Sequence, residues 1–219
     1  MHFSITNLQN IQKNLNSVVS ENSIDSPKII AVTKTFPIKT IIPLIEFGHR
    51  DFGENKIQEA VEKWSGVKSK YDNLKLHMLG KLQTNKVKYL IPLFDYIHSL
   101  DNLRLAEKIA KEEIKKNKKI SIFIQVNIGS EVQKNGVEVD DLFSFYNECT
   151  ANLSLNIIGL MCLPPRSKKA DFYFLKLKKL AKNLNLKYLS MGMSEDYQVA
   201  TKNGATHLRI GSKIFGNRD

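Results

Sequence analysis

A lysine, an arginine and two short polar loops are the parts of this sequence whose residue types and spacing could do chemistry together. In AVTKTFP, strand alternation places Lys34 on one face with Ile30 and Val32, where an aliphatic residue is expected. A lysine amine that loses hydration beside another cation becomes a neutral nucleophile that can attack a carbonyl carbon. Lys34 is therefore a candidate for Schiff-base chemistry. The alternative is a strand-end lysine whose amine extends into solvent.

Arg209 lies within HLRIG and shares a strand face with His207 and Gly211, so we expect it to point into the mouth of a closed parallel barrel. A guanidinium only donates hydrogen bonds, so it would keep the ring nitrogen of a cofactor such as pyridoxal 5′-phosphate unprotonated. That ring is then a poorer electron sink than one paired with a carboxylate. The alternative partners for Arg209 are neighbouring carbonyl groups or Glu54.

Two loops could hold a phosphate group. In GMSEDY, we expect Ser194 to be a helix N-cap whose following backbone N–H groups point into the loop. In RIGSKIFG, Gly211 and Ser212 offer further donors. Plain helix capping is the alternative for Ser194, because Glu195 and Asp196 would satisfy the helix dipole without a ligand.

The elements that must position these residues alternate along the whole sequence. Eight short apolar or β-branched runs predict strands at 28–36, 51–55, 74–80, 94–100, 120–128, 155–163, 187–194 and 206–216. Helical spacing predicts helices at 38–48, 56–66, 85–91, 102–117, 138–150, 168–184 and 195–204, with an extra amphipathic helix before the first strand. Eight parallel strands with intervening helices close most economically as a (β/α)8 barrel, a TIM barrel of the α/β class.

Residues 1–219 are expected to form one TIM-barrel domain, since no linker or shift in composition divides them. An open, doubly wound sheet is the alternative, but the turn TKTFP after the first strand has no glycine-rich phosphate loop. In a barrel the carboxyl ends of the strands meet at one mouth. We expect these polar strand-end residues there: Lys34, Asn55, His77, Asn127, Ser194 and Arg209. Lys81 and Lys86 are expected nearby.

Composition narrows the class of protein. Hydrophobic residues make up 42% and charged residues 25%, which excludes wholesale disorder. The 2 cysteines are too few for a secreted disulfide framework, and no apolar run reaches the ~20 residues needed to cross a bilayer. The N-terminal segment lacks the continuous apolar stretch of a signal peptide, so we expect a soluble, cytoplasmic protein without a metal site.

The formal net charge of +11 raises nucleic acid or an anionic membrane as partners. Most lysines, however, occupy the polar positions of helical segments such as AEKIAKEEIKKNKK. No nucleic-acid-binding motif accompanies them, so dedicated nucleic-acid binding is the minority hypothesis.

Seven strings, in order from residue 31 to residue 218, resemble the pyridoxal phosphate homeostasis proteins, a family similar to the barrel domain of alanine racemase. They are AVTKTFP, FGENKIQEA, HMLGKLQTNK, VNIGSEVQKNG, GLMCLPP, LSMGMSEDYQVA and HLRIGSKIFGNR. Each string is weak alone, but the ordered set is specific. The sequence departs from the family pattern at the rim of the site, at Lys56, Met78 and Leu79, and in a short loop after Pro165.

The resemblance implies pyridoxal 5′-phosphate held as an internal aldimine. It implies these cofactor-binding residues: Lys34 for the Schiff base, Asn55 at the cofactor's edge, Ser194, Gly211 and Ser212 for the phosphate, and Arg209 at the ring nitrogen. The roles of His77 and Asn127 stay open.

The family is thought to buffer and deliver pyridoxal phosphate in the cell and to influence amino-acid and keto-acid balance without an established reaction. We therefore expect a cofactor carrier and not an enzyme, with apo pyridoxal-phosphate enzymes as recipients; the resemblance also favours a monomer. Racemases of this barrel type take a second base from an additional β domain, and this sequence ends at Asp219 directly after the eighth strand, so we expect no such domain. A racemase or another pyridoxal-phosphate enzyme is the alternative, with Tyr173, Tyr197 or His207 as candidate bases.

Overall fold

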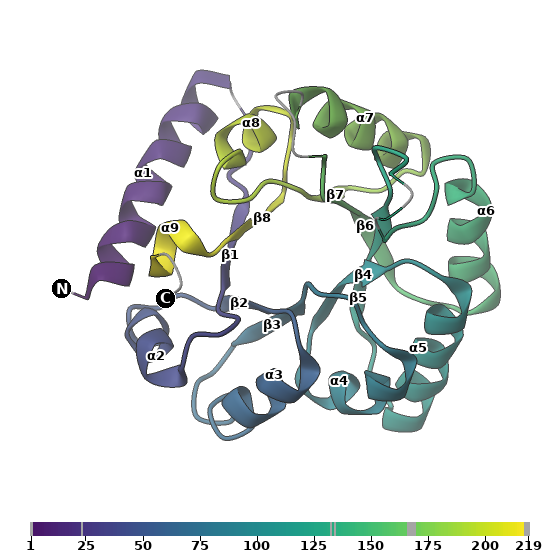
Figure 1. Ribbon diagram of the computed structural model, residues 1–219, viewed down its shortest axis with the longest axis horizontal. Coiled ribbons are helices and arrows are strands. Elements are labelled where there is room, and N and C mark those ends of the chain that lie inside the picture. The colour runs from purple at the N-terminus through teal and green to yellow at the C-terminus, as the bar shows by residue number, and fades with distance from the viewer. Residues whose placement is uncertain (1, 23, 132, 134, 166–169, 217–219) are drawn as a thin grey trace.

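A computed structural model describes residues 2–22, 24–131, 133, 135–165 and 170–216, which form a closed barrel of eight parallel strands surrounded by helices (Figure 1). Hydrogen-bonded neighbours follow sequence order from β1 to β8, and β1 pairs with β8 to close the ring. The predicted TIM barrel is confirmed, and the β1–β8 pairing excludes the open-sheet alternative. Among the described residues, no helix is both long and apolar enough to cross a bilayer.

The strands are β1 (Lys28–Val32), β2 (Asp51–Glu54), β3 (Lys75–Met78), β4 (Tyr96–Leu100), β5 (Ser121–Val126), β6 (Ile157–Cys162), β7 (Tyr188–Ser190) and β8 (His207–Ile210). Most predicted runs extend past the carboxyl end of the observed strand. The largest difference is at 206–216, where β8 is followed by the short helix α9 (Ser212–Phe215). Four residues are too few for a helical period to emerge from the sequence.

The helices between strands lie close to their predicted places. They are α2 (Ile38–Glu46), α3 (Ile57–Trp64), the 3₁₀-helix η1 (Thr84–Lys86) with α4 (Val87–Leu93), α5 (Leu103–Lys116), α6 (Leu142–Asn147) with the π-helix η2 (Glu148–Asn152), α7 (Ala170–Asn183) and α8 (Tyr197–Lys202). The short loop predicted after Pro165 falls on residues 166–169, outside the described residues, as does the predicted start of α7.

The N-terminal helix α1 (Phe3–Asn22) fills the place in the outer ring that the short α9 leaves open (Figure 1). Its buried residues form one stripe at helical spacing: Ser4, Leu8, Ile11, Leu15 and Val18. It packs against α8 and α9. Asn7 Nδ2 donates to the Ile214 carbonyl at 3.0 Å, and Asn14 Nδ2 donates to the Tyr197 hydroxyl at 3.3 Å. The helix therefore supports the segments that follow β7 and β8.

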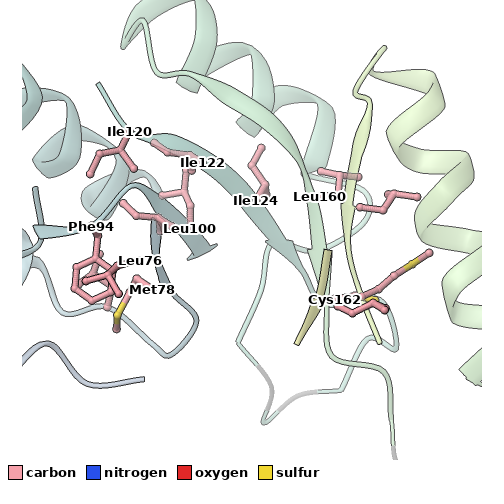
Figure 2. Close-up of a cluster of buried hydrophobic side chains, with 14 of the residues drawn as sticks. Leu76, Met78, Phe94, Leu100, Ile120, Ile122, Ile124, Leu160 and Cys162 are labelled. Atoms are coloured by element: carbon pink, nitrogen blue, oxygen red, sulfur yellow. The ribbon is translucent and has the colours of Figure 1, made fainter. Parts of the chain in front are cut away.

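Most apolar packing lies between the outer faces of the strands and the helices. Figure 2 shows part of this layer, where Leu76, Phe94 and Leu160 are fully buried. Full burial of such a side chain contributes about 1.5–3 kcal/mol relative to exposure. The inside of the barrel is less apolar, because aromatic and imidazole rings and polar groups from strands on opposite sides meet there. The His98 ring of β4, for example, lies 6.0 Å from the His207 ring of β8.

Gly159 in β6 leaves no room for a side chain. A Cβ atom there would collide with the backbone carbonyl of Tyr188 in β7 and come within 2.9 Å of the Phe123 ring. We expect Gly159→Ala to lower the free energy of unfolding by about 1–3 kcal/mol, because a paired backbone carbonyl cannot move aside. Gly66→Ala is the matched control, since nothing lies within 4 Å of a Cβ there, and its effect should stay within about 0.5 kcal/mol. Urea unfolding measures both, and an unchanged stability for Gly159→Ala would contradict this packing.

Candidate cofactor site

The segments that follow β1, β7 and β8 meet at the carboxyl-end mouth of the barrel. The ring of Phe36, after β1, lies 5.0 Å from the ring of Phe215 in α9. The Ser194 hydroxyl oxygen, after β7, accepts a hydrogen bond from the backbone N–H of Lys213 in α9 at 3.4 Å. Strand closure thus gathers the turn that contains Lys34 and both loops proposed to hold phosphate around one opening.

Lys34 lies two residues past the end of β1 and is half-buried in a turn. The next residue, Thr35, has a φ of 70°, which a β-branched residue rarely adopts. Side chains from α3 hold this turn. The Glu59 carboxylate accepts from the Thr35 backbone N–H at 2.5 Å, and Lys63 Nζ donates to the Thr33 carbonyl at 2.8 Å. The backbone on both sides of Lys34 is therefore fixed.

The ion pair between Glu54 and Lys63 is buried behind this turn and anchors its backbone. Glu54 Oε1 accepts hydrogen bonds from Lys63 Nζ at 2.9 Å, Trp64 Nε1 at 2.9 Å and Thr33 Oγ1 at 2.7 Å. Lys63 also contacts the Glu59 carboxylate at 2.9 Å. The Glu54 side chain is fully buried and that of Lys63 is 8% exposed. Glu54 therefore faces α3 and its ion pair, and it belongs to the support of the Lys34 turn.

Arg209 is buried inside the barrel, one strand away from β1. Its Nη1 donates to the Ser190 hydroxyl at 2.6 Å, and its Nη2 donates to the Cys162 carbonyl at 2.8 Å. Among the described residues it forms no ion pair with a carboxylate. Glu54, one of the alternative partners suggested by the sequence, is bound to Lys63 instead. A neighbouring carbonyl, the other alternative, does contact Arg209.

A buried guanidinium without a contacting carboxylate favours a ligand that presents an electron pair. Burial lowers the pKa of the Arg209 guanidinium from its usual value, which reflects the cost of keeping the cation out of water. The two bonds to protein use two of its five N–H donors. An unprotonated ring nitrogen is an acceptor of the required kind. The residues at this mouth therefore fit an aromatic aldehyde that carries a ring nitrogen and a phosphate.

The loop after β7 differs in detail from the prediction. Helix α8 begins at Tyr197 with Asp196 as its N-cap residue, so the prediction that Ser194 caps this helix is wrong. The Asp196 carboxylate accepts a hydrogen bond from the Met193 backbone N–H at 2.6 Å and closes a turn before the helix. This turn leaves the half-buried Ser194 hydroxyl to bridge to α9.

The remaining proposed cofactor contacts also lie at strand ends around the mouth. Gly211 is the N-cap residue of α9, and a Cβ atom on it would approach the Val32 carbonyl of β1 to 3.4 Å. Ser212 follows it and is exposed. Asn55 directly follows β2, is half-buried, and packs its backbone so closely on Gly80 that a Cβ atom there would collide with it. Asn55 is therefore held by the loop after β3.

Of two further residues expected at the mouth, His77 lies elsewhere, and Asn127, directly after β5, uses its side chain locally. His77 is fully buried inside the barrel, and its Nε2 lies 3.0 Å from the carboxylate of Asp51, the first residue of β2. Its expected place at the mouth is wrong: alternation turns its side chain inward, and the register pairs His77 with Tyr96, the first residue of β4, so the side chain lies toward the amino ends. Asn127 uses its amide within its own loop, where it bonds the Glu131 backbone and the Glu138 carboxylate.

Ser190 and His98, which were not predicted as site residues, connect to Arg209 inside the barrel: Ser190 Oγ lies 2.6 Å from Arg209 Nη1 and 2.8 Å from His98 Nδ1. A usable signal existed, since His98 and Ser190 are polar residues within apolar strand runs. Lys81, expected near the mouth, is exposed and donates to Asn135 Oδ1 at 2.8 Å. Among the described residues, no group of three or more ligating side chains could hold a metal ion.

Comparisons with known proteins agree with this arrangement. The family model "Alanine racemase, N-terminal domain" matches residues 6–219. The pyridoxal phosphate homeostasis protein of Aquifex aeolicus is 38% identical over 200 residues, 87% of each chain, and that of Haemophilus influenzae is 32% identical over 97% of this chain and 95% of that one. PipY of Synechococcus elongatus, solved with PLP bound, has a TM-score of 0.81 at 31% identity and covers 93% of this chain and 99% of its own.

Alanine racemase from Clostridium difficile shares the fold alone, with a TM-score of 0.75 at 14% identity over 57% of that chain. The fold and the mouth thus define the class of protein as a barrel of the alanine racemase N-terminal type. Within that class, the chain belongs to the pyridoxal phosphate homeostasis protein family, as its ordered motifs predicted.

The Glu54–Lys63 pair should be important for stability. Lys63→Met is expected to lower the free energy of unfolding by about 3–5 kcal/mol, because it leaves a fully buried carboxylate without its cation. Lys75→Met is the matched control: Lys75 is 44% exposed, 3.8 Å from Asp95, and should contribute no more than about 1 kcal/mol. Adding Glu54→Gln to Lys63→Met should recover part of the loss. If Lys63→Met and Lys75→Met lower the free energy of unfolding equally in urea unfolding, the Glu54–Lys63 pair does not have the importance for stability that we expect.

The buried imidazoles should make the protein sensitive to acid. Burial lowers the pKa of His207 to about 3, and burial also lowers the pKa values of His77 and His98. These groups stay neutral in the folded protein but take up protons in the unfolded state below about pH 6.5. Because the unfolded state then binds more protons, their contribution to stability is complete above about pH 6.5. It falls as the pH drops from there toward 3.

His207→Gln should reduce this loss by up to about 1.4 kcal/mol per pH unit between about pH 6 and pH 4. Phe123→Leu is the control, since it weakens packing against the same ring, at 5.0 Å, without removing a titrating group. It should lower stability equally at every pH. Urea unfolding at a series of pH values measures the difference, and parallel curves for the wild type and His207→Gln would show that His207 does not titrate on unfolding.

Proposed function

We propose that this protein binds pyridoxal 5′-phosphate covalently at Lys34 and serves in its intracellular homeostasis as a buffering and delivery carrier. The observation that carries the proposal is the buried Arg209, which has no carboxylate partner among the described residues and lies beneath the mouth. The crystal structure of PipY with PLP bound, and the names of the curated relatives, support the choice of ligand.

Each proposed contact has a chemical reason. Lys34 supplies the amine for a Schiff base with the aldehyde, Arg209 donates to the ring nitrogen, and Asn55 lines the edge of the ring. The phosphate is held by hydroxyl and backbone donors of the two loops, at Ser194, Gly211 and Ser212. When bound, the cofactor supplies an electrophilic carbon and a conjugated ring. Residues 1–219 act together as one binding domain.

Holding the cofactor agrees better with this site than turnover does. A guanidinium cannot give the ring nitrogen a proton, so the ring stays a weak electron sink. Two of the three candidate second bases are engaged elsewhere. The Tyr197 hydroxyl bonds Asn14 of α1, and burial lowers the pKa of His207 to about 3, inside the barrel. Tyr173 lies on α7 and packs against the hydrophobic core.

The proposal includes a cytoplasmic monomer whose partners are apo forms of pyridoxal-phosphate enzymes. It includes no dedicated binding of nucleic acid or membranes. The net charge of +11 arises mainly from lysines spread over helix faces, such as Lys111, Lys115 and Lys116 of α5, which are exposed.

Titration with pyridoxal 5′-phosphate tests covalent binding. We expect a visible absorption band that borohydride bleaches, with the reduced adduct found by mass spectrometry on the peptide that contains Lys34. Lys34→Ala should abolish both signals. Lys81→Ala is the matched control, because Lys81 is an exposed lysine bonded to a different loop, and it should keep them. A wild-type protein that stays colourless with added cofactor would refute the proposal.

The loaded protein should also be incubated with D- and L-alanine and a panel of other amino acids. The carrier proposal expects transfer of cofactor to an apo-enzyme without sustained turnover of any amino acid. Continuous racemisation would instead establish the enzyme alternative. Salt-sensitive binding to DNA or RNA, without colour, is the result that the nucleic-acid hypothesis expects.

A further inference from the structure

Beneath Arg209, a row of hydrogen-bonded side chains crosses the barrel interior to its opposite end. The Ser190 hydroxyl oxygen lies 2.6 Å from Arg209 Nη1 and 2.8 Å from His98 Nδ1. His98 Nε2 lies 3.0 Å from His77 Nδ1, and His77 Nε2 lies 3.0 Å from Asp51 Oδ1. Five strands, β8, β7, β4, β3 and β2, contribute one side chain each. We call these five residues the Arg209–Asp51 row.

The Asp51 end of the row fixes the direction of every hydrogen bond in it, because a neutral imidazole has one donor and one acceptor nitrogen. The Asp51 carboxylate only accepts, so His77 carries its proton on Nε2 and donates to it. His77 Nδ1 then accepts from His98, which carries its proton on Nε2, and His98 Nδ1 accepts from the Ser190 O–H. The Ser190 oxygen also accepts from Arg209, which only donates. Both imidazoles are thereby assigned one tautomer.

The surroundings of the two histidines agree with this direction. Both are fully buried, and burial lowers the pKa of each, although the hydrogen bond to Asp51 acts in the opposite sense on His77. The His77 ring stacks on Tyr96 and the His98 ring stacks on Phe123, each with ring centres 4.3 Å apart. The imidazoles are therefore neutral, and aromatic neighbours hold their planes.

Asp51 ends the row at a cavity of about 480 Å³ at the amino end of the barrel, which Asp51 and Lys28 help to line. Lys28 Nζ donates to the same Asp51 oxygen at 3.1 Å. Burial raises the pKa of the Asp51 carboxyl, but the hydrogen bond from His77 and the charge of Lys28 outweigh it, and the net pKa is lowered. A carboxylate thus stands at the far end of the row from the buried guanidinium.

The row is not a path for protons to the mouth, because Arg209 neither releases nor accepts one at neutral pH. Its effect is electrostatic and geometric. Each dipole along it turns its electron-rich side toward Arg209, which stabilises the buried cation without a contacting carboxylate. The Ser190 oxygen and the Cys162 carbonyl accept from both terminal nitrogens of the planar guanidinium and so fix its plane.

We propose that Ser190, His98, His77 and Asp51 are positioning residues that orient Arg209 toward its ligand. The inference rests on the proposed function, in which that ligand is the ring nitrogen of pyridoxal 5′-phosphate. None of the four needs to touch the cofactor. They act by fixing the direction and the charge environment of the one side chain that does.

The direction of the row can be measured in the protein without cofactor. Long-range ¹H–¹⁵N NMR spectra should show both His77 and His98 as neutral Nε2–H tautomers. Asp51→Leu removes the terminal acceptor and should abolish this assignment at His77, whereas Asp51→Asn keeps an amide oxygen that can accept and should preserve it. An Nδ1–H tautomer or an imidazolium at either histidine of the wild type would overturn the proposal, whether or not the cofactor binds.

The effect on the ligand is measured in the loaded protein. We expect Ser190→Ala to shift the visible absorption band and to speed loss of the cofactor to an apo-acceptor by about tenfold or more, and Ser190→Thr to restore both. Thr201→Val is the matched control, because Thr201 is also buried and its hydroxyl donates one hydrogen bond, to the Tyr197 carbonyl at 2.7 Å, within α8 and outside the row. It should change neither. If Ser190→Ala does not fold, Asp51→Leu, at the partly exposed end of the row, should give the same shift on a smaller scale.

The two proposals fail in distinguishable ways. If borohydride attaches the cofactor to Lys34 in both the wild type and Ser190→Ala, with the same band and release rate, the positioning role is wrong and the proposed function stands. If the wild type takes up no cofactor, the proposed function is wrong. The NMR measurement of the His77 and His98 tautomers then remains as the test of whether the Arg209–Asp51 row orients Arg209.

Discussion

Burial of the Arg209 charge is the constraint on which the rest of the interior depends. A guanidinium inside a barrel loses its hydration, and here no carboxylate among the described residues contacts it. A carbonyl and a hydroxyl replace part of that hydration, and the hydroxyl is in turn polarised by two imidazoles and a distant carboxylate. The inside of this barrel is therefore polar where TIM barrels usually stack layers of branched aliphatic residues.

The apolar stabilisation accordingly lies outside the strands. The continuous hydrophobic cluster runs between the strand faces and the surrounding helices (Figure 2). Closure of the ring pairs β1, which leads into the Lys34 turn near one end of the sequence, with β8, which carries Arg209 near the other. Helix α1 covers α8 and α9 and so connects the outer packing to the loops at the mouth.

Lys34 and Arg209 are positioned from different sides of the barrel wall. The Lys34 turn is fixed from outside the strands, by the Glu54–Lys63 pair and Glu59. Arg209 is fixed from inside, by the polar row. An amine on a rigid turn and a guanidinium that cannot protonate a ring nitrogen suit the retention of an aldehyde cofactor more than the stabilisation of a carbanion. The exposed lysines of the helices, which account for most of the net charge, take no part in either arrangement.

The sequence alone determined the barrel, its strand order and the family, because period and motif order are local properties of the chain. It also predicted that Arg209 would point inward, since alternation within one short strand fixes a face. It could not decide what each inward side chain would meet. His77 was expected at the mouth and lies deep inside, Ser194 was expected to cap α8 and bridges to α9, and the links from Ser190 to His98 to His77 went unnoticed. The Ser190–His98 contact joins β7 to β4 across the barrel, and the other contacts depend on how neighbouring strands are staggered. Only closure of the ring, with its stagger and tilt, therefore determines which of them form.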